Sequence, residues 1–480
     1  MNTKPVTAKQ KRATENREPL LMLPCLLDQA SIRYKNKVAI ITQDQQLTYC
    51  ELEARVQRLS AFFIQKGIRK SCRVIIAIPS SIELVISILS LIRIGAVACP
   101  VNYKFPQALK RRVRTQLDSE WLICLDSEHC DQGNHITQSS IKCHLEFRSS
   151  AQDGNRIYYS SDAPCNIILT SGSSGTPRSA VFGYQQHYFS ALGANTLVPL
   201  KPGDRNLISL PIFHISGIAI IFRCLMAGAT MVLPDGNDLP SNIARFRITH
   251  ASMVNTQLKR FLNQNSGAST LKHVLVGGGP VDHTLLDQAK RVHINCWHTY
   301  GLTEMASQVF THDPNGFGTT LPYRELSLSN HGEILVRGPT LFQGYYDKGM
   351  LRLPLNDQGW FSTKDIAELS DSRLKIVGRK DCQFISGGEN IQPEEIECFI
   401  NQLEGINQCI VVAKKDPEFG FVPVAFIDSD RQLNTGRLQG LLRQQLPNFM
   451  IPKEVYAWRF NQGIKPNRAE LKEVAASTEF

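Results

Sequence analysis

Short β-rich runs alternate with stretches of helical period over much of this chain. The segment LTYCELEARVQRLSAFFIQKGI (residues 47–68) spaces its apolar residues along one face of a helix and ends at Gly67. The run RVIIAI (residues 73–78) follows as a β-rich segment and closes at Pro79. Because strands that alternate with helices pair in parallel, residues 20–160 are predicted to form a parallel α/β layer.

The same pattern continues toward residue 280. RNLISLPIFHISG (205–217), ATMVLP (229–234), ASMV (251–254) and KHVLVGGGP (272–280) are apolar runs that end in turn residues. We interpret them as strand ends that open onto loops, where α/β folds place their ligands. The sequence therefore predicts a binding site along these loops.

The pattern changes near residues 379–381. A helix (PEEIECFINQL), two strands (QCIVVAKKD and VPVAFID) and a helix beginning near Asn434 are predicted beyond that point, as a small α+β unit. At 480 residues the chain is too long for one compact core. We expect a basic polar tail (1–18), a large N-terminal domain (19–379) and a small C-terminal domain (380–480), joined by a hinge near Asp381.

Composition excludes several classes of protein. Apolar residues make up 42% of the chain and charged residues 20%, as in soluble globular proteins, and the net charge of +10 is spread rather than blocked. Lys/Arg runs interleaved with aromatics are absent, so we expect no nucleic-acid partner. The 13 cysteines form no CxxC pair, which fits a reducing cytosol and signals no zinc site.

We expect neither a secretion signal nor an integral membrane segment. The apolar stretch ELVISILSLIRIGAVACPV (83–101) is interrupted by Arg93 and Gly95, and the beginning of the sequence lacks the pattern of a signal peptide. The localisation that we predict is therefore cytoplasmic.

LTSGSSGTPRSAVF (169–182) is suited to binding phosphate. Its glycines allow backbone amides to approach an anion, and its Ser/Thr hydroxyls can donate to phosphate oxygens. It is not a Walker A loop, because the GxxxxGK[ST] spacing fails and RSAVF is predicted to be a strand. Taken alone, the segment is also compatible with a Ser/Gly hairpin between two strands.

Further motifs decide between these alternatives. TSGSSGTPR resembles the phosphate loop of the adenylate-forming enzymes, and YGLTE (300–304), GWFSTKD (359–365), IVGRKD (376–381), SGGENIQPEEIE (386–397) and GIKPNRAEL (463–471) follow in that superfamily's order. The resemblance implies an α/β fold, with a large N-terminal domain of stacked α/β layers and a small mobile α+β C-terminal domain. It also implies ATP-dependent activation of a carboxylic acid to an acyl-adenylate and transfer to CoA, with Mg²⁺.

The resemblance assigns roles by position. The groups that it implies for the ATP phosphates are Thr170, Ser171, Gly172, Ser173, Ser174, Gly175 and Arg178. Those for adenine and ribose are Gly277, Gly278, Gly279, Tyr300, Gly301, Asp365 and Arg379. Read without the family, these residues would be core packing, turns or surface ion pairs.

Other motif positions imply catalytic or conformational roles. Glu304 matches the magnesium ligand, with Thr303 as a phosphate-side hydroxyl, and Lys465 matches the lysine that enters the site during adenylation. Gly387 and Gly388 match the loop used in the thioester half-reaction, and Asp381 matches the hinge residue.

The chain departs from the family pattern in three places. Arg178 replaces the usual loop lysine, Ser179 replaces a usual glycine, and Pro466 replaces an aliphatic residue. Because the charge at position 178 is retained, we expect that Arg178 serves as an exchangeable cation for the phosphates.

Within the superfamily, SLPIFHISG, YGLTEMAS and GIKPNRAELKE resemble the o-succinylbenzoate–CoA ligases of menaquinone biosynthesis. That resemblance implies an aromatic dicarboxylate as substrate. Arg223 is the candidate partner for the second carboxylate, with a structural ion pair or a surface-reaching side chain as alternatives. His214, Thr256 and Ser307 are candidates for the wall of the acyl pocket, with satisfied core polar groups as the alternative.

Alternatives at the level of function stay open. They are another aryl- or acyl-CoA ligase, and a catalytically silent nucleotide-binding homologue. The expected partners are small molecules, and a homo-oligomer is left open.

Overall fold

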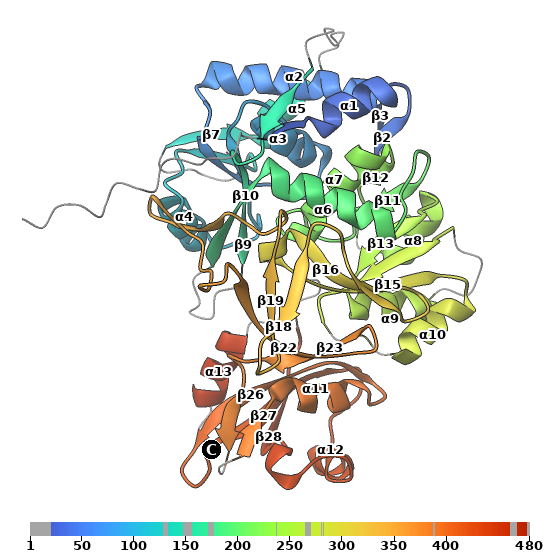
Figure 1. The fold of residues 1–480 in the computed structure, drawn as a ribbon, viewed down its shortest axis with the longest axis vertical. Helices are drawn as coiled ribbons and strands as arrows, with labels where there is room; N and C mark the ends of the chain where they lie inside the picture. Colours follow the sequence, from blue (N-terminus) through green and yellow to red (C-terminus); the bar gives the residue numbers. More distant parts are fainter. Residues whose placement is uncertain are drawn as a thin grey trace, which may run out of the picture.

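The computed structural model describes residues 21–127, 133–146, 156–170, 177–236, 238–264, 270–279, 281, 283–386, 389–460 and 468–477. Two large sheets form its main body (Figure 1). The strands of the first, in spatial order, are β21 (Met350–Arg352), β20 (Gly344–Asp347), β10 (Arg178–Gly183), β9 (Pro164–Thr170), β5 (Val97–Pro100), β4 (Arg73–Ala77), β6 (Trp121–Cys124) and β7 (Asn134–Thr137).

The second large sheet carries most of the strand ends that the sequence predicted. Its spatial order is β17 (Gly318–Thr320), β16 (Ser307–His312), β15 (Asn295–Leu302), β14 (His273–Val276), β13 (His250–Met253), β11 (Arg205–Leu207), β12 (Thr230–Val232), β2 (Val38–Ile41) and β3 (Gln46–Thr48). The strands from β15 to β2 pair in parallel. Their carboxyl ends therefore share one edge of the sheet.

Helices cover and separate these sheets. They are α1 (Leu26–Arg33), α2 (Tyr49–Lys66), α3 (Ile82–Arg93), α4 (Gln107–Gln116), α5 (Gln138–Glu146), α6 (Tyr184–Leu197), α7 (Ile215–Ala227), α8 (Leu239–Arg245), α9 (Asn255–Gln264) and α10 (His283–Arg291). The predicted helix of residues 47–68 is confirmed as α2. It begins at a capping box formed by Thr48 and Glu51 and ends at Gly67, whose φ of 104° favours glycine.

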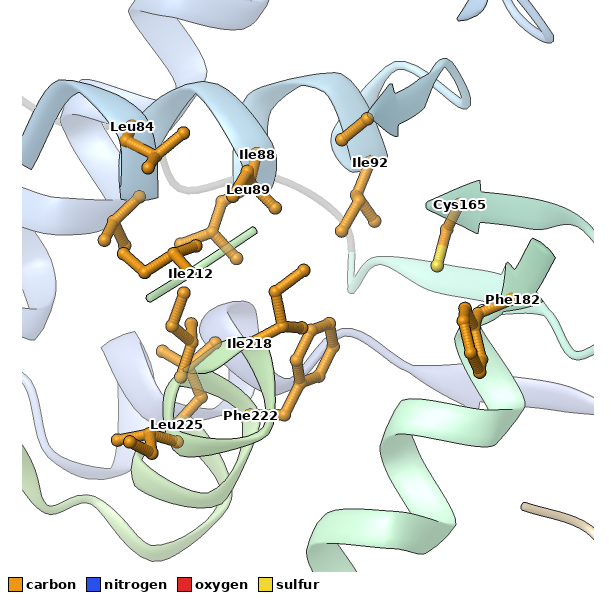
Figure 2. Packing of buried hydrophobic residues seen from close by; sticks show 14 of the residues in the cluster. Leu84, Ile88, Leu89, Ile92, Cys165, Phe182, Ile212, Ile218, Phe222 and Leu225 are labelled. Atoms are coloured by element: carbon orange, nitrogen blue, oxygen red, sulfur yellow. The ribbon is translucent and has the colours of Figure 1, made fainter. Parts of the chain in front are cut away.

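The main core lies between the two large sheets and includes α2, α3, α6 and α7. Figure 2 shows Ile88 and Ile92 of α3 facing Ile218 and Phe222 of α7. All four are 4% exposed or less. Burial of apolar side chains between the sheets is the main force that holds the layers together.

Residues 20–160 were predicted to form one parallel α/β layer. In this range β4, β5, β6 and β7 do pair in parallel in the first large sheet, but β2 and β3 belong to the second sheet and pair antiparallel, so the range does not form a single layer. The margins of both sheets also depart from parallel pairing. The pairs β9–β10, β10–β20 and β20–β21 are antiparallel, as are β15–β16 and β16–β17. Several of these pairs are joined by connections too short for the crossover that parallel pairing needs. The resulting sheets are mixed.

A smaller sheet leads toward the C-terminal unit. It consists of β18 (Glu325–Leu328), β19 (Glu333–Arg337), β22 (Phe361–Ser370) and β23 (Arg373–Arg379). There are also two two-stranded sheets. β1 (Met22–Pro24) pairs with β8 (Tyr158–Ser160), and β24 (Phe384–Ser386) pairs with β25 (Glu389–Ile391) at the beginning of the C-terminal unit.

The C-terminal unit lies at one end of the molecule (Figure 1). It has its own hydrophobic cores. Its elements are α11 (Pro393–Asn401), β26 (Ile406–Asp416), β27 (Gly420–Ser429), α12 (Thr435–Leu442), β28 (Glu454–Ala457) and α13 (Arg468–Ser477). The predicted helix, two strands and helix are confirmed as α11, β26, β27 and α12. The sequence analysis did not predict β28, which pairs in parallel with β27, or α13.

No helix among the described residues combines the length and apolar character needed to cross a membrane.

Candidate active site

The turn between β15 and β16 carries the YGLTE motif. Thr303 and Glu304 lie in a single 3-10 turn (Thr303–Met305), after which the chain reverses through Ala306 and Ser307, with φ values of 52° and 106°. A Cβ atom on Gly301 would lie 2.1 Å from the Ser307 carbonyl oxygen. Only glycine therefore allows the two strands to approach this closely.

Three motifs that are far apart in the sequence meet beside this turn. The Tyr300 hydroxyl donates to Asp365 Oδ2 at 2.7 Å, and Arg379 Nη1 donates to Asp365 Oδ1 at 2.9 Å. Burial, together with the Asp365 charge, raises the pKa of Tyr300 well above its usual value. The phenol therefore stays protonated at neutral pH and fixes the Asp365 carboxylate.

Arg379 joins this group to the predicted hinge. Its Nε and Nη2 donate to the two carboxylate oxygens of Asp381 at 2.9 and 3.1 Å. Partial burial raises the pKa of Asp381, but the hydrogen bonds from Arg379 outweigh it and hold the pKa below its usual value. Arg379 thus bridges Asp365 and Asp381.

Glu304 contacts a residue that the sequence analysis did not single out. The Tyr345 hydroxyl, on β20, donates to Glu304 Oε1 at 2.5 Å, and the Arg178 guanidinium lies 5.4 Å from the centre of the Tyr345 ring. Burial and the Glu304 charge raise the pKa of Tyr345. The sequence GYY around Tyr345 does not by itself predict this contact, because the contact depends on how β20 pairs with β10.

The described residues contain no group of three or more His, Cys, Asp or Glu side chains that would hold a metal ion by themselves. Glu304 offers carboxylate oxygens, the hard ligands that Mg²⁺ prefers. A magnesium ion here would take its other ligands from phosphate oxygens and water, as is usual for nucleotide-bound Mg²⁺.

The glycine turn lies beside Tyr300 at the carboxyl edge of the parallel strands. Gly277 follows β14 directly, and its Cβ position faces Thr299 of β15 at 3.0 Å. Gly278 has a φ of 88° and Gly279 is exposed. The turn therefore offers bare backbone beside Thr299, the residue before Tyr300.

Arg223 is a buried cation on α7. It is 4% exposed, and its Nε donates to Asn195 Oδ1 at 3.4 Å. None of the described carboxylates lies within ion-pair distance of its guanidinium. Burial lowers the pKa of Arg223, as expected for a charge in an apolar environment.

The other acyl-pocket candidates lie on different elements. His214 is the N-cap residue of α7, and burial lowers its pKa, so its ring is neutral at pH 7. Ser307 lies half-buried in the left-handed turn, whereas Thr256 is exposed on the first turn of α9. No described hydrogen bond joins the Thr256 side chain to the other three residues.

Several predicted site residues lie outside the described part of the chain. They are Ser171, Gly172, Ser173, Ser174, Gly175, Gly387, Gly388 and Lys465. The strands that flank the first group are described: β9 ends at Thr170 and β10 begins at Arg178, which pair with each other across an antiparallel ladder. Arg178 is exposed at the start of β10.

Comparison with protein families gives matches in both parts of the chain. A family model described as "AMP-binding enzyme" matches residues 27–346, and one described as "AMP-binding enzyme C-terminal domain" matches residues 395–460.

Curated relatives match over most of their length. The 2-succinylbenzoate–CoA ligase of Salmonella typhimurium is 36% identical over 445 residues, covering 91% of this chain and 94% of the relative. The enzyme of the same name from Bacillus subtilis is 27% identical over 441 residues, which cover 88% of this chain and 91% of the relative.

Solved structures share the fold. An arginine-to-lysine variant of E. coli MenE with bound OSB-AMS superposes with a TM-score of 0.85 at 32% identity, covering 95% of this chain and 99% of that one. The o-succinylbenzoate CoA synthetase of Bacillus subtilis in complex with ATP and magnesium ion gives a TM-score of 0.83 at 25% identity, covering 95% and 100%.

Proposed function

Since this chain belongs to the AMP-binding enzyme family and is an adenylate-forming CoA ligase, we propose that it acts on 2-succinylbenzoate. The reaction converts 2-succinylbenzoate, ATP and CoA into 2-succinylbenzoyl-CoA, AMP and diphosphate, as a step of menaquinone biosynthesis. Relatives that carry this name match over about nine-tenths of both chains, which supports the same substrate here.

The burial of Arg223 without an acidic partner among the described residues is the observation that supports this substrate. The guanidinium is 4% exposed, and the only side-chain partner among the described residues is the neutral Asn195 amide. Much of its buried charge is therefore uncompensated. 2-Succinylbenzoate has two carboxylates, of which only the succinyl one is activated. The second carboxylate would supply the missing anion and accept two parallel hydrogen bonds from the guanidinium.

The first half-reaction needs stabilisation of negative charge rather than covalent catalysis. The substrate carboxylate attacks the α-phosphate of ATP and expels diphosphate, so cations and oriented donors lower the barrier. Asp365 and Arg379 would bind the ribose and the adjoining phosphate, Thr303 and Arg178 the phosphates, and Lys465 the carboxylate and α-phosphate. Mg²⁺, held by Glu304, would neutralise phosphate charge.

The second half-reaction transfers the acyl group to the CoA thiol, which attacks the acyl-adenylate carbonyl and displaces AMP. We assign Asp381 as the pivot between the large domain and a C-terminal domain that begins at residue 380. Arg379 supports this assignment, because it bonds to Asp365 on one side and Asp381 on the other. Its carbonyl also accepts from Gln392 Nε2, at the start of α11, at 3.1 Å.

Isotope exchange between ATP and diphosphate tests the proposal. The exchange is measured with 2-succinylbenzoate, benzoate, a medium-chain fatty acid or no acid, and thioester formation is then measured with CoA. We expect exchange with 2-succinylbenzoate well above the other acids, and none without acid. Preference for another acid would refute the substrate, and absence of exchange with every acid would refute the ligase activity.

A further inference from the structure

Arg324 is a second buried arginine without an acidic partner among the described residues. It is 6% exposed, and burial lowers its pKa to about 9. Its Nε donates to the Gln308 carbonyl at 2.7 Å and its Nη1 to the Pro322 carbonyl at 2.8 Å. Further hydrogen bonds reach the Phe189 carbonyl at 3.5 Å, and the carbonyl and hydroxyl of Ser190 at 3.3 and 3.1 Å. The guanidinium is thus a buried crosslink between α6, β16 and the segment before β18.

Ser190 extends this crosslink to the site. Its hydroxyl donates to the Ala306 carbonyl at 2.5 Å. Ser190 and Arg324 therefore hold the carbonyls of Ala306 and Gln308, the residues on either side of Ser307. Neither residue is predicted from the sequence, because neither belongs to a motif.

The backbone that they hold is strained. Ala306 and Ser307 are successive non-glycine residues with φ of 52° and 106°. Each such residue costs about 1–3 kcal/mol and persists only where its surroundings over-determine the conformation. The buried hydrogen bonds from Ser190 and Arg324 supply that constraint.

We propose that Arg324 and Ser190 are positioning residues for acyl-adenylate formation. They hold the turn of residues 303–307 in the conformation that aims Thr303 and Glu304 at the ATP phosphates and places Ser307 beside the acyl group. This inference rests on the proposed function. Both residues act through the backbone of the turn, because neither contacts Glu304 directly among the described hydrogen bonds.

Loss of this crosslink should affect turnover more than ATP binding. Tyr300, Asp365 and Arg379 are linked by their own hydrogen bonds, none of which passes through Arg324. A displacement of about 1 Å in a positioning group can cost about 10²-fold in rate. We therefore expect Arg324→Met to lower kcat for 2-succinylbenzoate-dependent ATP–diphosphate exchange about 100-fold, with the KM for ATP changed less than about threefold.

Arg205→Met is the matched control. Arg205, on β11, is half-buried and, like Arg324, donates to a backbone carbonyl, that of Phe246 from Nη1 at 2.7 Å, but it lies outside the proposed site. Thermal unfolding is measured for both variants. Arg205→Met should lose stability yet keep wild-type kcat and KM. Arg324→Lys should recover part of the lost kcat, because an ammonium can donate to some of the same carbonyls.

The inference is overturned if Arg324→Met keeps kcat within twofold of wild type. It is also overturned if the lost kcat of Arg324→Met follows only its folded fraction. Should Arg324→Met not fold, Ser190→Ala decides: we expect a folded protein with kcat lowered about tenfold, and unchanged kcat refutes the positioning role. Wild-type exchange is measured alongside: its absence with every acid refutes the proposed function, whereas normal wild-type exchange with unaffected variants refutes the positioning role alone.

Discussion

Replacement of Arg223 by methionine separates a substrate-binding role from a structural one. In the free protein, the guanidinium is buried, its Nε contacts Asn195 Oδ1 at 3.4 Å, and none of the described carboxylates pairs with it. Methionine fills similar volume without a charge. The lost hydrogen bond to the neutral Asn195 amide and the relieved desolvation of the guanidinium charge roughly offset each other, so we expect the free energy of unfolding to change by less than about 1 kcal/mol.

The preference for 2-succinylbenzoate should change much more than the stability of the fold. Removal of one partner of a buried ion pair costs about 3–5 kcal/mol, and each 1.4 kcal/mol is tenfold. Arg223→Met should therefore lower kcat/KM for 2-succinylbenzoate by about 100- to 4,000-fold. Benzoate lacks the second carboxylate, so its kcat/KM should change less than about threefold. Arg223→Lys, which keeps the charge but loses the two-pronged geometry, should be intermediate.

The assay is ATP–diphosphate exchange at varied acid concentration, with urea unfolding in parallel. Arg93→Met is the control, because the Arg93 side chain, 10% exposed, pairs with the buried Glu53 at 2.6 and 2.8 Å. It should destabilise the fold by about 3–5 kcal/mol without a change in acid preference. An unchanged preference for 2-succinylbenzoate in Arg223→Met would refute the argument. A destabilisation as large as that of Arg93→Met would instead show that Arg223 is structural.

Three further predictions concern the phosphates, the adenylation lysine and acid stability. Arg178→Lys should change the KM for ATP less than about threefold, whereas Arg178→Ala should raise it about tenfold at unchanged acid affinity. Initial-rate kinetics measure both values, and equal KM values for the two variants would contradict the prediction. Lys465→Ala should slow adenylate formation about 10²-fold but spare thioester formation from supplied acyl-adenylate; equal loss of both rates would be inconsistent with the role. Burial lowers the pKa of His187 to about 3 and of His250 to about 4, so below pH 6.5 the unfolded chain binds protons that the folded chain does not. The free energy of unfolding from urea titrations should thus fall by up to about 1.4 kcal/mol per pH unit for each such histidine between pH 6 and 5, and His187→Gln should lower the slope by about that single contribution. An unchanged slope would count against the prediction.

Local pattern was enough to predict many of the elements. The apolar spacing of residues 47–68, which end near Gly67, predicts a helix because all the relevant residues are neighbours along the chain. The runs that begin at residues 73 and 272 contain the strands β4 (Arg73–Ala77) and β14 (His273–Val276) for the same reason. The antiparallel margins β20 and β21 were not predicted, since the partner of an edge strand depends on distant segments.

The sequence by itself determined the membership of the family, the order of the motifs and the chemistry that their residue types can perform. Only the tertiary structure decided which side chains meet. Tyr300 and Asp365 are separated by 65 residues, Glu304 and Tyr345 by 41, and Ser190 and Arg324 by 134. Contacts at such separations depend on the packing of sheets and helices against one another. The spacing of apolar residues along the chain indicates which face of a helix or strand is apolar. The register between two elements is defined only once the layers have assembled.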